Sequence, residues 1–361
     1  MASHPPTPGH RRLRVAILGA TGAVGQRFVQ ILNDHPWFEI TALAASERSA
    51  GQRYRDACRW VVPGDPPTDI GDLEIQPLEP NLPAEIVFSA VPSSVAREIE
   101  PRFAEAGYLV CSNASTFRNV DDVPLLIPEI NADHLDLVAH QRAQRGWPGL
   151  IVASPNCTIT GVAMALKPLD IAFGVRKVFM VSMQAISGAG YPGVAAMDIL
   201  GNVIPYIPGE EEKFQQELQK LLGRVDDRGL SEADLVVSAH ANRVPVLDGH
   251  TVSLSVGFER APTPEAALEV LTHYPPPEVC RRLPSSPERV LHVRTEPDRP
   301  QPRRDRDAGA GMVISVGRVR ACPLLDLRLT TVTHNTLRGA ASGAVLNAEL
   351  LVTQGYTDTI L

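Results

Sequence analysis

The sequence predicts an α/β protein with a doubly wound Rossmann-type N-terminal domain and a second, α+β domain built on a mixed sheet. In the first part, a glycine-rich turn follows an apolar segment, and short apolar and helical segments then alternate. Longer β-rich segments dominate residues 175–335. The 361 residues exceed what one core usually holds, and 44% of them are hydrophobic, so two cores are expected.

Composition excludes several classes of protein. A net charge of -7 without clustered Lys and Arg argues against a nucleic-acid-binding surface. The five cysteines are widely spaced and include no CxxC pair, which disfavours a disulfide framework or a zinc site. Residues 1–12 lack the apolar core of a signal peptide, and no apolar run approaches the ~20 residues of a membrane span. We therefore expect a cytoplasmic protein with a disordered leader, no metal and no membrane partner.

The first element is a strand over Val15–Leu18, followed by the turn "GATGAVG" and a helix. Glycines in this context let backbone N–H groups approach a pyrophosphate at the positive end of the helix. A tight turn without a ligand is the alternative, and the strand–turn–helix context disfavours it. The expected dinucleotide contacts here are Gly19, Thr21, Gly22, Ala23, Val24 and Gly25.

The second strand, residues 38–45, leads into Ser46, Glu47, Arg48 and Ser49. NAD-selective folds usually place an acid about 20 residues past the glycines, to bind the ribose 2′-hydroxyl. Two hydroxyls and an arginine instead suit a 2′-phosphate, with Glu47 facing away because neighbours on an extended segment point oppositely. This favours NADP(H), although Arg48 could also be an ordinary surface arginine.

Further strands are expected over residues 85–92, 108–115 and 149–154, with a helix from Ser93 to about residue 106. Strands that alternate with helices indicate a parallel sheet. Ser89, at the end of one strand, is a further expected cofactor contact.

Residues 154–335 form the expected catalytic and dimerisation domain, whereas residues 13–153 and 336–361 form the cofactor domain. The closing segment "RGAASGAVLNAELLV" reads as a helix that returns to the first domain. Residues 284–309, which include Arg303, Arg304 and Arg306, read as a polar loop. Expected strands lie in 175–187, 235–258, 311–321 and 324–335, with helices in "EEEKFQQELQKLL" and "TPEAALEVLTHY".

Cys157 in "SPNCT" lies just past an apolar strand and at the start of a helix. The positive end of a helix favours a thiolate there, but most free cysteines are small buried hydrophobes. Position alone leaves both interpretations open. His250 has an unperturbed pKa near 6.5 and can complete a thiol–imidazole pair, yet a lone histidine on a strand is more often structural.

Eight segments together resemble the aspartate-semialdehyde dehydrogenase family, in its archaeal and fungal variety, over about residues 13–355. They are "GATGAVG", "SERSAG", "SNASTFR", "SPNCT", "ISGAGYPG", "GEEEKF", "NRVPVLDGHT" and "HNTLRGAASG". The resemblance implies NADP-dependent reductive dephosphorylation of 4-phospho-L-aspartate to aspartate 4-semialdehyde through a cysteine thioester. This step serves biosynthesis of lysine, threonine, methionine and isoleucine.

The resemblance also implies roles for individual residues. The catalytic group comprises Cys157 as nucleophile, His250 as acid and base, and Asn156 beside the oxyanion. The groups expected to hold the substrate are Gln184, Glu210 for the ammonium, and Arg243 for the carboxylate. The expected phosphate ligands are Arg118, Lys213 and, on weaker grounds, Asn113. The positions lining the nicotinamide are Ser187, Gly188 and Asn335.

Other interpretations remain at this point. Glu210 and Lys213 are three residues apart on one helix face and could be an exposed ion pair. N-acetylglutamyl-phosphate reductase shares the plan, but its acylated substrate nitrogen gives Glu210 no role. A malonyl-CoA reductase would not need both Arg118 and Lys213, and a non-catalytic NADP-binding protein would need neither Cys157 nor His250. The expected partners are the substrate, inorganic phosphate and further copies of the chain, as a homodimer or homotetramer.

Overall fold

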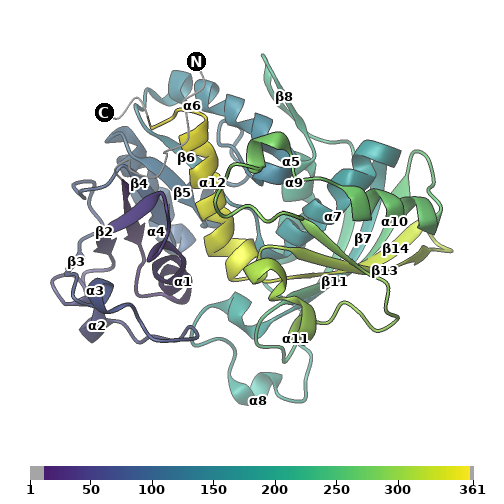
Figure 1. Cartoon of the computed structure of the whole chain (residues 1–361), viewed down its shortest axis with the longest axis horizontal. Coiled ribbons are helices and arrows are strands. Elements are labelled where there is room, and N and C mark those ends of the chain that lie inside the picture. Colours follow the sequence, from purple (N-terminus) through teal and green to yellow (C-terminus); the bar gives the residue numbers. More distant parts are fainter. Residues whose placement is uncertain (1–11, 358–361) are drawn as a thin grey trace.

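The computed structural model describes residues 12–357, in which two six-stranded sheets lie on either side of central helices (Figure 1). The predicted leader therefore lies outside the described residues, apart from Arg12. Within this range, no helix is both long and apolar enough to cross a membrane, and no group of three or more His, Cys, Asp or Glu residues could hold a metal ion.

The first sheet is parallel throughout, with the order β3-β2-β1-β4-β5-β6, which is the doubly wound order of dinucleotide-binding folds. The prediction of a Rossmann-type sheet is therefore confirmed. Its strands are β1 Leu13–Leu18, β2 Phe38–Ala44, β3 Ile75–Gln76, β4 Ile86–Ser89, β5 Leu109–Ser112 and β6 Leu150–Ala153. Its helices are α1 Ala23–Leu32, α2 Tyr54–Ala57, α3 Thr68–Gly71, α4 Ser93–Glu105, α5 Pro128–Asn131 and α6 Leu137–Arg145.

The second sheet is mixed, with the order β10-β7-β11-β14-β13-β12, as predicted. Its outer pairs β10–β7 and β12–β13 are parallel, and its inner pairs are antiparallel. A hairpin of Arg224–Asp226 and Gly229–Ser231 (β8 and β9) was not expected from the sequence. The strands are β7 Val175–Gln184, β10 Val236–Arg243, β11 His250–Phe258, β12 Leu291–Arg294, β13 Ile314–Ala321 and β14 Leu327–Thr333.

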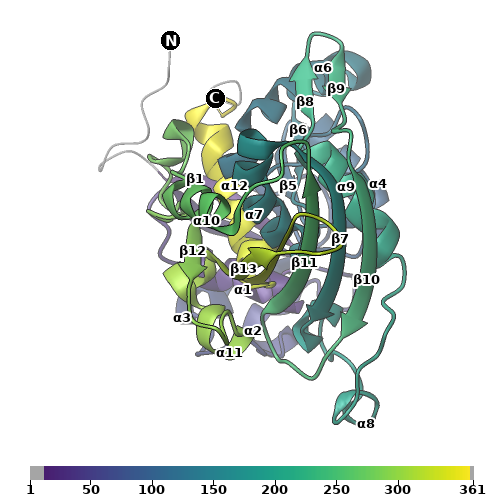
Figure 2. The same ribbon diagram turned by 90° about the vertical axis from the view of Figure 1, so that its right-hand side faces the viewer.

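Helices cover one face of the second sheet. α7 (Cys157–Phe173), α9 (Glu210–Leu221) and α10 (Pro264–His273) pack on its strands, so β7, β10 and β11 present their other face outward (Figure 2). This outer face carries exposed apolar side chains, Phe179 and Val236 among them. The short helix α8 (Ala196–Ile199) projects from the body of the molecule (Figure 1).

The last helix, α12 (Ser342–Thr353), returns to the first sheet and packs on β4 and β5. It follows a π-helical turn, Leu337–Ala341, and its residues from Ala344 to Val352 are buried. A buried ion pair fixes this return, since both terminal nitrogens of Arg338 donate to the carboxylate of Glu129, at 2.7 and 2.6 Å. The helix that covers β4 and β5 of the first sheet is therefore α12, the last helix described.

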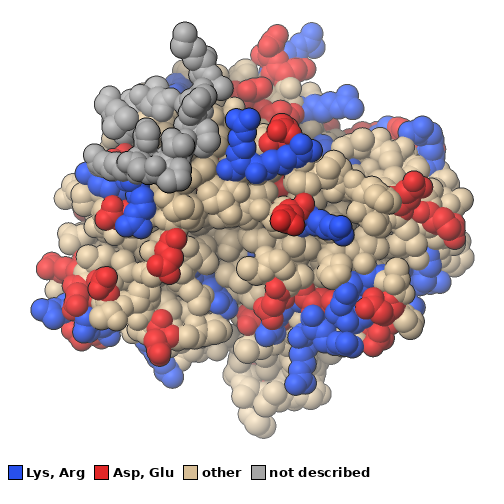
Figure 3. All heavy atoms as spheres, in the orientation of Figure 1, with Lys and Arg blue, Asp and Glu red and all other residues tan. Residues whose placement is uncertain are grey.

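The interpretation of residues 284–309 as a polar loop is wrong in part. The segment contains β12 and a helical turn, α11 (Pro302–Asp305). Asp305 is buried because it accepts hydrogen bonds from the Arg299 side chain and, at 2.6 Å, from the Gln301 backbone. Arg303 and Arg304 stay exposed, and on the face drawn in Figure 3 acidic and basic side chains are interspersed among uncharged ones.

We expect Glu129→Gln to cost about 3–5 kcal/mol of unfolding free energy, because it leaves the charge of Arg338 buried without a counter-ion. Urea unfolding followed by circular dichroism measures the loss. The matched control is Glu79→Gln, which breaks the exposed pair with Arg102 and should cost less than about 1 kcal/mol. Equal losses in the two variants would show that the Glu129–Arg338 pair does not hold the last helix in place.

Candidate active site

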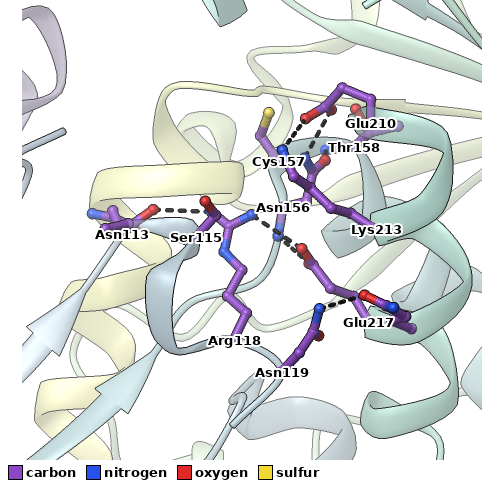
Figure 4. A network of polar contacts seen from close by, with 12 residues as sticks. Asn113, Ser115, Arg118, Asn119, Asn156, Cys157, Thr158, Glu210, Lys213 and Glu217 are labelled. Atoms are coloured by element: carbon purple, nitrogen blue, oxygen red, sulfur yellow. Dashed lines mark hydrogen bonds and ion pairs between the residues drawn. The ribbon is translucent and has the colours of Figure 1, made fainter. Parts of the chain in front are cut away.

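The site is built where β6 ends and α7 begins. Asn156 caps α7: its side-chain oxygen accepts a hydrogen bond from the backbone of Thr158 at 2.8 Å, which leaves Cys157 as the first helical residue. The apolar strand before it and the helix after it are both buried, so the cysteine is placed rigidly (Figure 4). The expected strand–cysteine–helix arrangement is present.

His250, the first residue of β11, lies beside the thiol. Its Nε2 is 3.2 Å from the sulfur of Cys157, and its Nδ1 accepts a hydrogen bond from the backbone N–H of Ala185 at 3.0 Å. Because Nδ1 accepts, the neutral ring carries its proton on Nε2 and presents it to the sulfur. Gly188 is needed there, since a Cβ at this position would be 2.9 Å from the imidazole Cε1.

Burial sets the protonation of this pair. It raises the pKa of Cys157 to about 12, an effect that Glu210 adds to and that Arg118 and Arg243 oppose. Burial also lowers the pKa of His250 to about 3, helped by the charge of Arg243. The pKa of His250 therefore lies well below its unperturbed value near 6.5, because the ring is buried at the start of β11, which the sequence does not show. At neutral pH both partners are uncharged.

The three residues expected to hold the substrate surround the same point. Glu210 accepts hydrogen bonds from the side chains of Asn156 at 2.8 Å and Gln184 at 3.4 Å. Arg243 donates to the carbonyl oxygen of Ala185 at 2.8 Å. Glu210 does pair with Lys213, at 3.5 Å, but its side chain is only 13% exposed. The pair therefore borders the thiol instead of lying on a solvated face.

Two of the three expected phosphate ligands have unused hydrogen-bond donors. Arg118 donates from Nη2 to the backbone oxygen of Asn113 at 2.9 Å, and from Nη1 to Glu217 at 3.1 Å. Its Nε and the side-chain nitrogen of Asn113 are buried and have no partner. Buried donors without partners are costly, so they suit a site that receives an anion.

Sequence reasoning missed Glu217 and Gly339. Glu217 is buried on α9, seven residues after Glu210 and hence on the same helix face, a spacing that could have indicated it. Gly339 packs directly on the nucleophile, since a Cβ there would lie 2.8 Å from the Cβ of Cys157. The sequence carries no local signal for this contact.

The glycine-rich turn has the close packing that a cofactor cradle requires. A Cβ at Gly25 would be 2.3 Å from the oxygen of Gly19, and Gly19 itself has a φ of +76°. Gly22, Ala23 and Val24 follow at the start of α1 and Thr21 just before it, as expected from the sequence. Ser89, in contrast, is fully buried at the end of β4.

Residues 46–50, which follow β2, form a turn and not the extended segment predicted from the sequence. The backbone N–H groups of Ser49 and Ala50 both bond to the oxygen of Ser46, at 2.9 and 3.1 Å, which closes a turn. The argument that Glu47 and Arg48 point oppositely is therefore wrong. Both side chains are exposed on this turn, as is Ser46.

The residues expected to line the nicotinamide meet at one place. The side-chain nitrogen of Asn335 donates to the hydroxyl of Ser187 at 2.8 Å, and its oxygen accepts from the backbone of Gly249 at 2.8 Å. Asn335, which follows β14, thus connects the turn after β7 to the turn before β11.

Comparison with known proteins agrees with this geometry. Two family models match the chain: "Semialdehyde dehydrogenase, NAD binding domain" over residues 14–138 and "Semialdehyde dehydrogenase, dimerisation domain" over residues 166–338. The fold and the site therefore define a semialdehyde dehydrogenase.

Individual relatives show which family of semialdehyde dehydrogenases the chain resembles. Aspartate-semialdehyde dehydrogenase of Archaeoglobus fulgidus is 51% identical over 94% of this chain and 98% of its own length. The Schizosaccharomyces pombe enzyme of the same name is 44% identical, over 95% and 98%. A crystal structure of aspartate semialdehyde dehydrogenase with NADP from Candida albicans superposes with a TM-score of 0.88 at 41% identity, covering 95% of this chain and 99% of that one. The chain belongs to the aspartate-semialdehyde dehydrogenase family.

The protonation of the pair predicts how the resting thiol reacts. Alkylation by iodoacetamide requires a thiolate, and the raised pKa of Cys157 keeps the thiolate fraction below that of an ordinary cysteine at neutral pH. We expect the alkylation rate to rise continuously from pH 6 to pH 9, as followed by mass spectrometry of the Cys157 peptide. Cys157→Ser is the control for labelling elsewhere. A rate that is already constant above pH 6 would indicate a preformed thiolate–imidazolium pair.

Proposed function

We propose that the chain catalyses the NADP-dependent reduction of 4-phospho-L-aspartate to aspartate 4-semialdehyde, with release of phosphate. One observation carries the proposal: the Cys157 sulfur lies 3.2 Å from Nε2 of His250, and a carboxylate and two arginines lie around them. A nucleophile, a hydrogen-bond donor and binding groups of both charges are what an acyl-transfer step on a charged amino acid requires.

In the proposed reaction, the sulfur of Cys157 attacks the acyl carbon, and the bond from that carbon to the phosphate oxygen breaks. The thiol proton leaves with the phosphate group as hydrogen phosphate, so a neutral thioester remains on the enzyme. Arg118, Lys213 and Asn113 hold the phosphate, and Arg243 and Glu210 hold the α-carboxylate and the ammonium. Gln184 hydrogen-bonds to Glu210 and orients it.

His250 works through the proton that it holds on Nε2. This proton stabilises charge on the sulfur when the thiol reacts and on the reacting oxygen when the thioester is reduced. The expected acid–base role of His250 thus takes the form of hydrogen-bond donation, because Ala185 occupies Nδ1. The side-chain nitrogen of Asn156 lies beside the same centre and is proposed as the second donor.

NADP(H) fits the first domain, whose glycine-rich turn is tightly packed at Gly19 and Gly25 but exposes Gly22 at the start of α1, where a pyrophosphate would bind. When bound, the cofactor would supply the hydride that reduces the thioester carbonyl carbon. The bond from that carbon to the sulfur of Cys157 then breaks, the aldehyde leaves, and the sulfur takes up one proton from solvent to restore the thiol. The exposed turn that carries Ser46, Arg48 and Ser49 would hold the 2′-phosphate of the cofactor. Asn335 would hold Ser187 and Gly188 against its nicotinamide ring. The residues proposed to bind the cofactor are Gly19, Thr21, Gly22, Ala23, Val24, Gly25, Ser46, Arg48, Ser49, Ser89, Ser187, Gly188 and Asn335.

The chain is also proposed to act as a homodimer that contacts its second copy through the outer face of β7, β10 and β11. The match to a dimerisation domain and the exposed Phe179 and Val236 support this assembly. Free cysteines suit the reducing cytoplasm, where amino-acid biosynthesis would use this enzyme. The proposed cofactor domain comprises residues 13–153 and 336–361, and the catalytic domain residues 154–335.

The direct test is an assay in the reverse direction. We expect the wild-type chain to reduce NADP⁺ with aspartate semialdehyde only when phosphate is present, and to turn over N-acetylglutamate semialdehyde poorly. Cys157→Ala should abolish turnover and leave NADP⁺ binding intact, because the thiol forms the covalent intermediate and does not hold the cofactor. Preference for the acetylated aldehyde, or turnover by the alanine variant, would contradict the proposal.

Glu210 and Lys213 decide between a substrate with a free ammonium and one without. Glu210→Gln removes the charge and keeps the shape, so kcat/KM for aspartate semialdehyde should fall about ten- to hundredfold, the loss expected for a hydrogen bond to a charged group. Lys213→Met should mainly raise the KM for phosphate. Steady-state kinetics with each substrate varied separate the two effects. If both are merely a surface pair, the kinetics will not change and only stability will shift, by about 0.2–0.5 kcal/mol.

A further inference from the structure

Glu217 is the buried charge of this site to which the proposed reaction gives no role. Its side chain is 1% exposed and lies on the face of α9 that also carries Phe214, Leu218 and Leu221. A leucine would fill this position at no electrostatic cost, whereas a buried carboxylate is unfavourable unless it is fully paired. The reason for an acid here must lie in the groups that it contacts.

Both oxygens of Glu217 are engaged, and by different parts of the chain. Oε1 accepts from Nη1 of Arg118 at 3.1 Å, and Oε2 accepts from the backbone N–H of Asn156 at 2.5 Å. Arg118 lies in the segment that follows β5 of the first sheet, and Asn156 is the residue before the nucleophile (Figure 4). One carboxylate therefore connects the proposed phosphate ligand to the start of α7.

Asn156 is held at three points, which makes the connection rigid. Its backbone N–H is bound by Glu217, its side-chain oxygen by Thr158 and its side-chain nitrogen by Glu210. Cys157 is the next residue, so a shift of Asn156 moves the sulfur as well. Arg118 in turn is held by Glu217 and by the backbone of Asn113, and its Nε stays free for an anion.

We propose that Glu217 is a positioning residue that sets the distance between the phosphate held by Arg118 and the sulfur of Cys157. The inference rests on the proposed function, since it assigns phosphate to Arg118. In the acyl phosphate, the phosphate group and the attacked carbon are joined through one oxygen. Attack at that carbon therefore requires both protein groups in one fixed relation, and small displacements of positioning groups reduce catalysis strongly.

The test is Glu217→Gln, which keeps the shape but offers a single oxygen, so its NH₂ group must face either Arg118 or the Asn156 N–H. We expect a higher KM for phosphate. We also expect kcat/KM for aspartate semialdehyde to fall by about tenfold or more, because a small misplacement of the phosphate relative to the sulfur reduces catalysis strongly. The dissociation constant for NADP⁺ should not change. Glu217→Asp, which keeps the charge but is too short to reach both donors, should change the kinetics in the same direction even if the glutamine variant does not fold.

The matched control is Glu349→Gln. Glu349 is also a buried helix carboxylate, but it accepts from Ser285 at 2.5 Å and lies 2.8 Å from Nε2 of His35, away from the site. This variant should lose stability and keep the KM for phosphate. If both Glu217 variants keep the wild-type KM for phosphate, or change only stability as Glu349→Gln does, Glu217 is purely structural and the proposal is wrong.

A second readout needs no turnover and therefore separates this inference from the proposed function. Inorganic phosphate bound at Arg118 should slow alkylation of Cys157 by iodoacetamide in the wild type. In Glu217→Gln the same protection should require more phosphate. If the wild type lacks the proposed activity but the variant shows this shift, the function is wrong and the role of Glu217 stands. Identical protection curves in the two proteins would overturn the role of Glu217.

Discussion

Close backbone contact around the start of α7 decides where every other group of the site can lie. A Cβ at Gly161 would be 1.8 Å from the hydroxyl of Thr333, so α7 lies almost directly on β14. Gly339 closes the other side against Cys157. The helix is thus held on two sides, and the thiol of its first residue lies 3.2 Å from His250 on the neighbouring strand β11. The pair is thus a consequence of how tightly one helix packs on the second sheet.

Elements with a local signal could be predicted from the sequence. The glycine-rich turn, the alternation that forms the parallel sheet, and the helix that begins at Cys157 all depend on residues close together in the chain. The spacing from Glu210 could have placed Glu217 on the site's face of α9, but its contacts could not be predicted, because Arg118 lies 99 residues from it and Asn156 lies 61 residues from it. The pKa of His250 likewise depends on burial by strands and turns that are distant in sequence. The turn after β2 was missed because backbone hydrogen bonds, not side chains, define it.

Buried carboxylates serve as connectors throughout the molecule. Glu129, Glu217 and Glu349 each lie on a helix and each bind a group from a distant segment. A pair of this kind contributes little net stability compared with apolar packing, but an alternative arrangement that breaks it leaves a charge buried. These contacts therefore act mainly by disfavouring arrangements in which the joined segments separate. At Glu217 one of the joined segments contains the residue before the nucleophile.

The return of α12 to the first sheet has a consequence for how the protein is made. β4 and β5 leave the ribosome more than two hundred residues before the helix that covers them (Ser342–Thr353). Until translation ends, one face of the early sheet has no permanent cover, and a nascent chain in this state exposes apolar strands to aggregation and to chaperones. Synthesis of the cofactor domain thus begins first and its folding finishes last, so a chain truncated before its final helix leaves β4 and β5 of the first sheet without this cover.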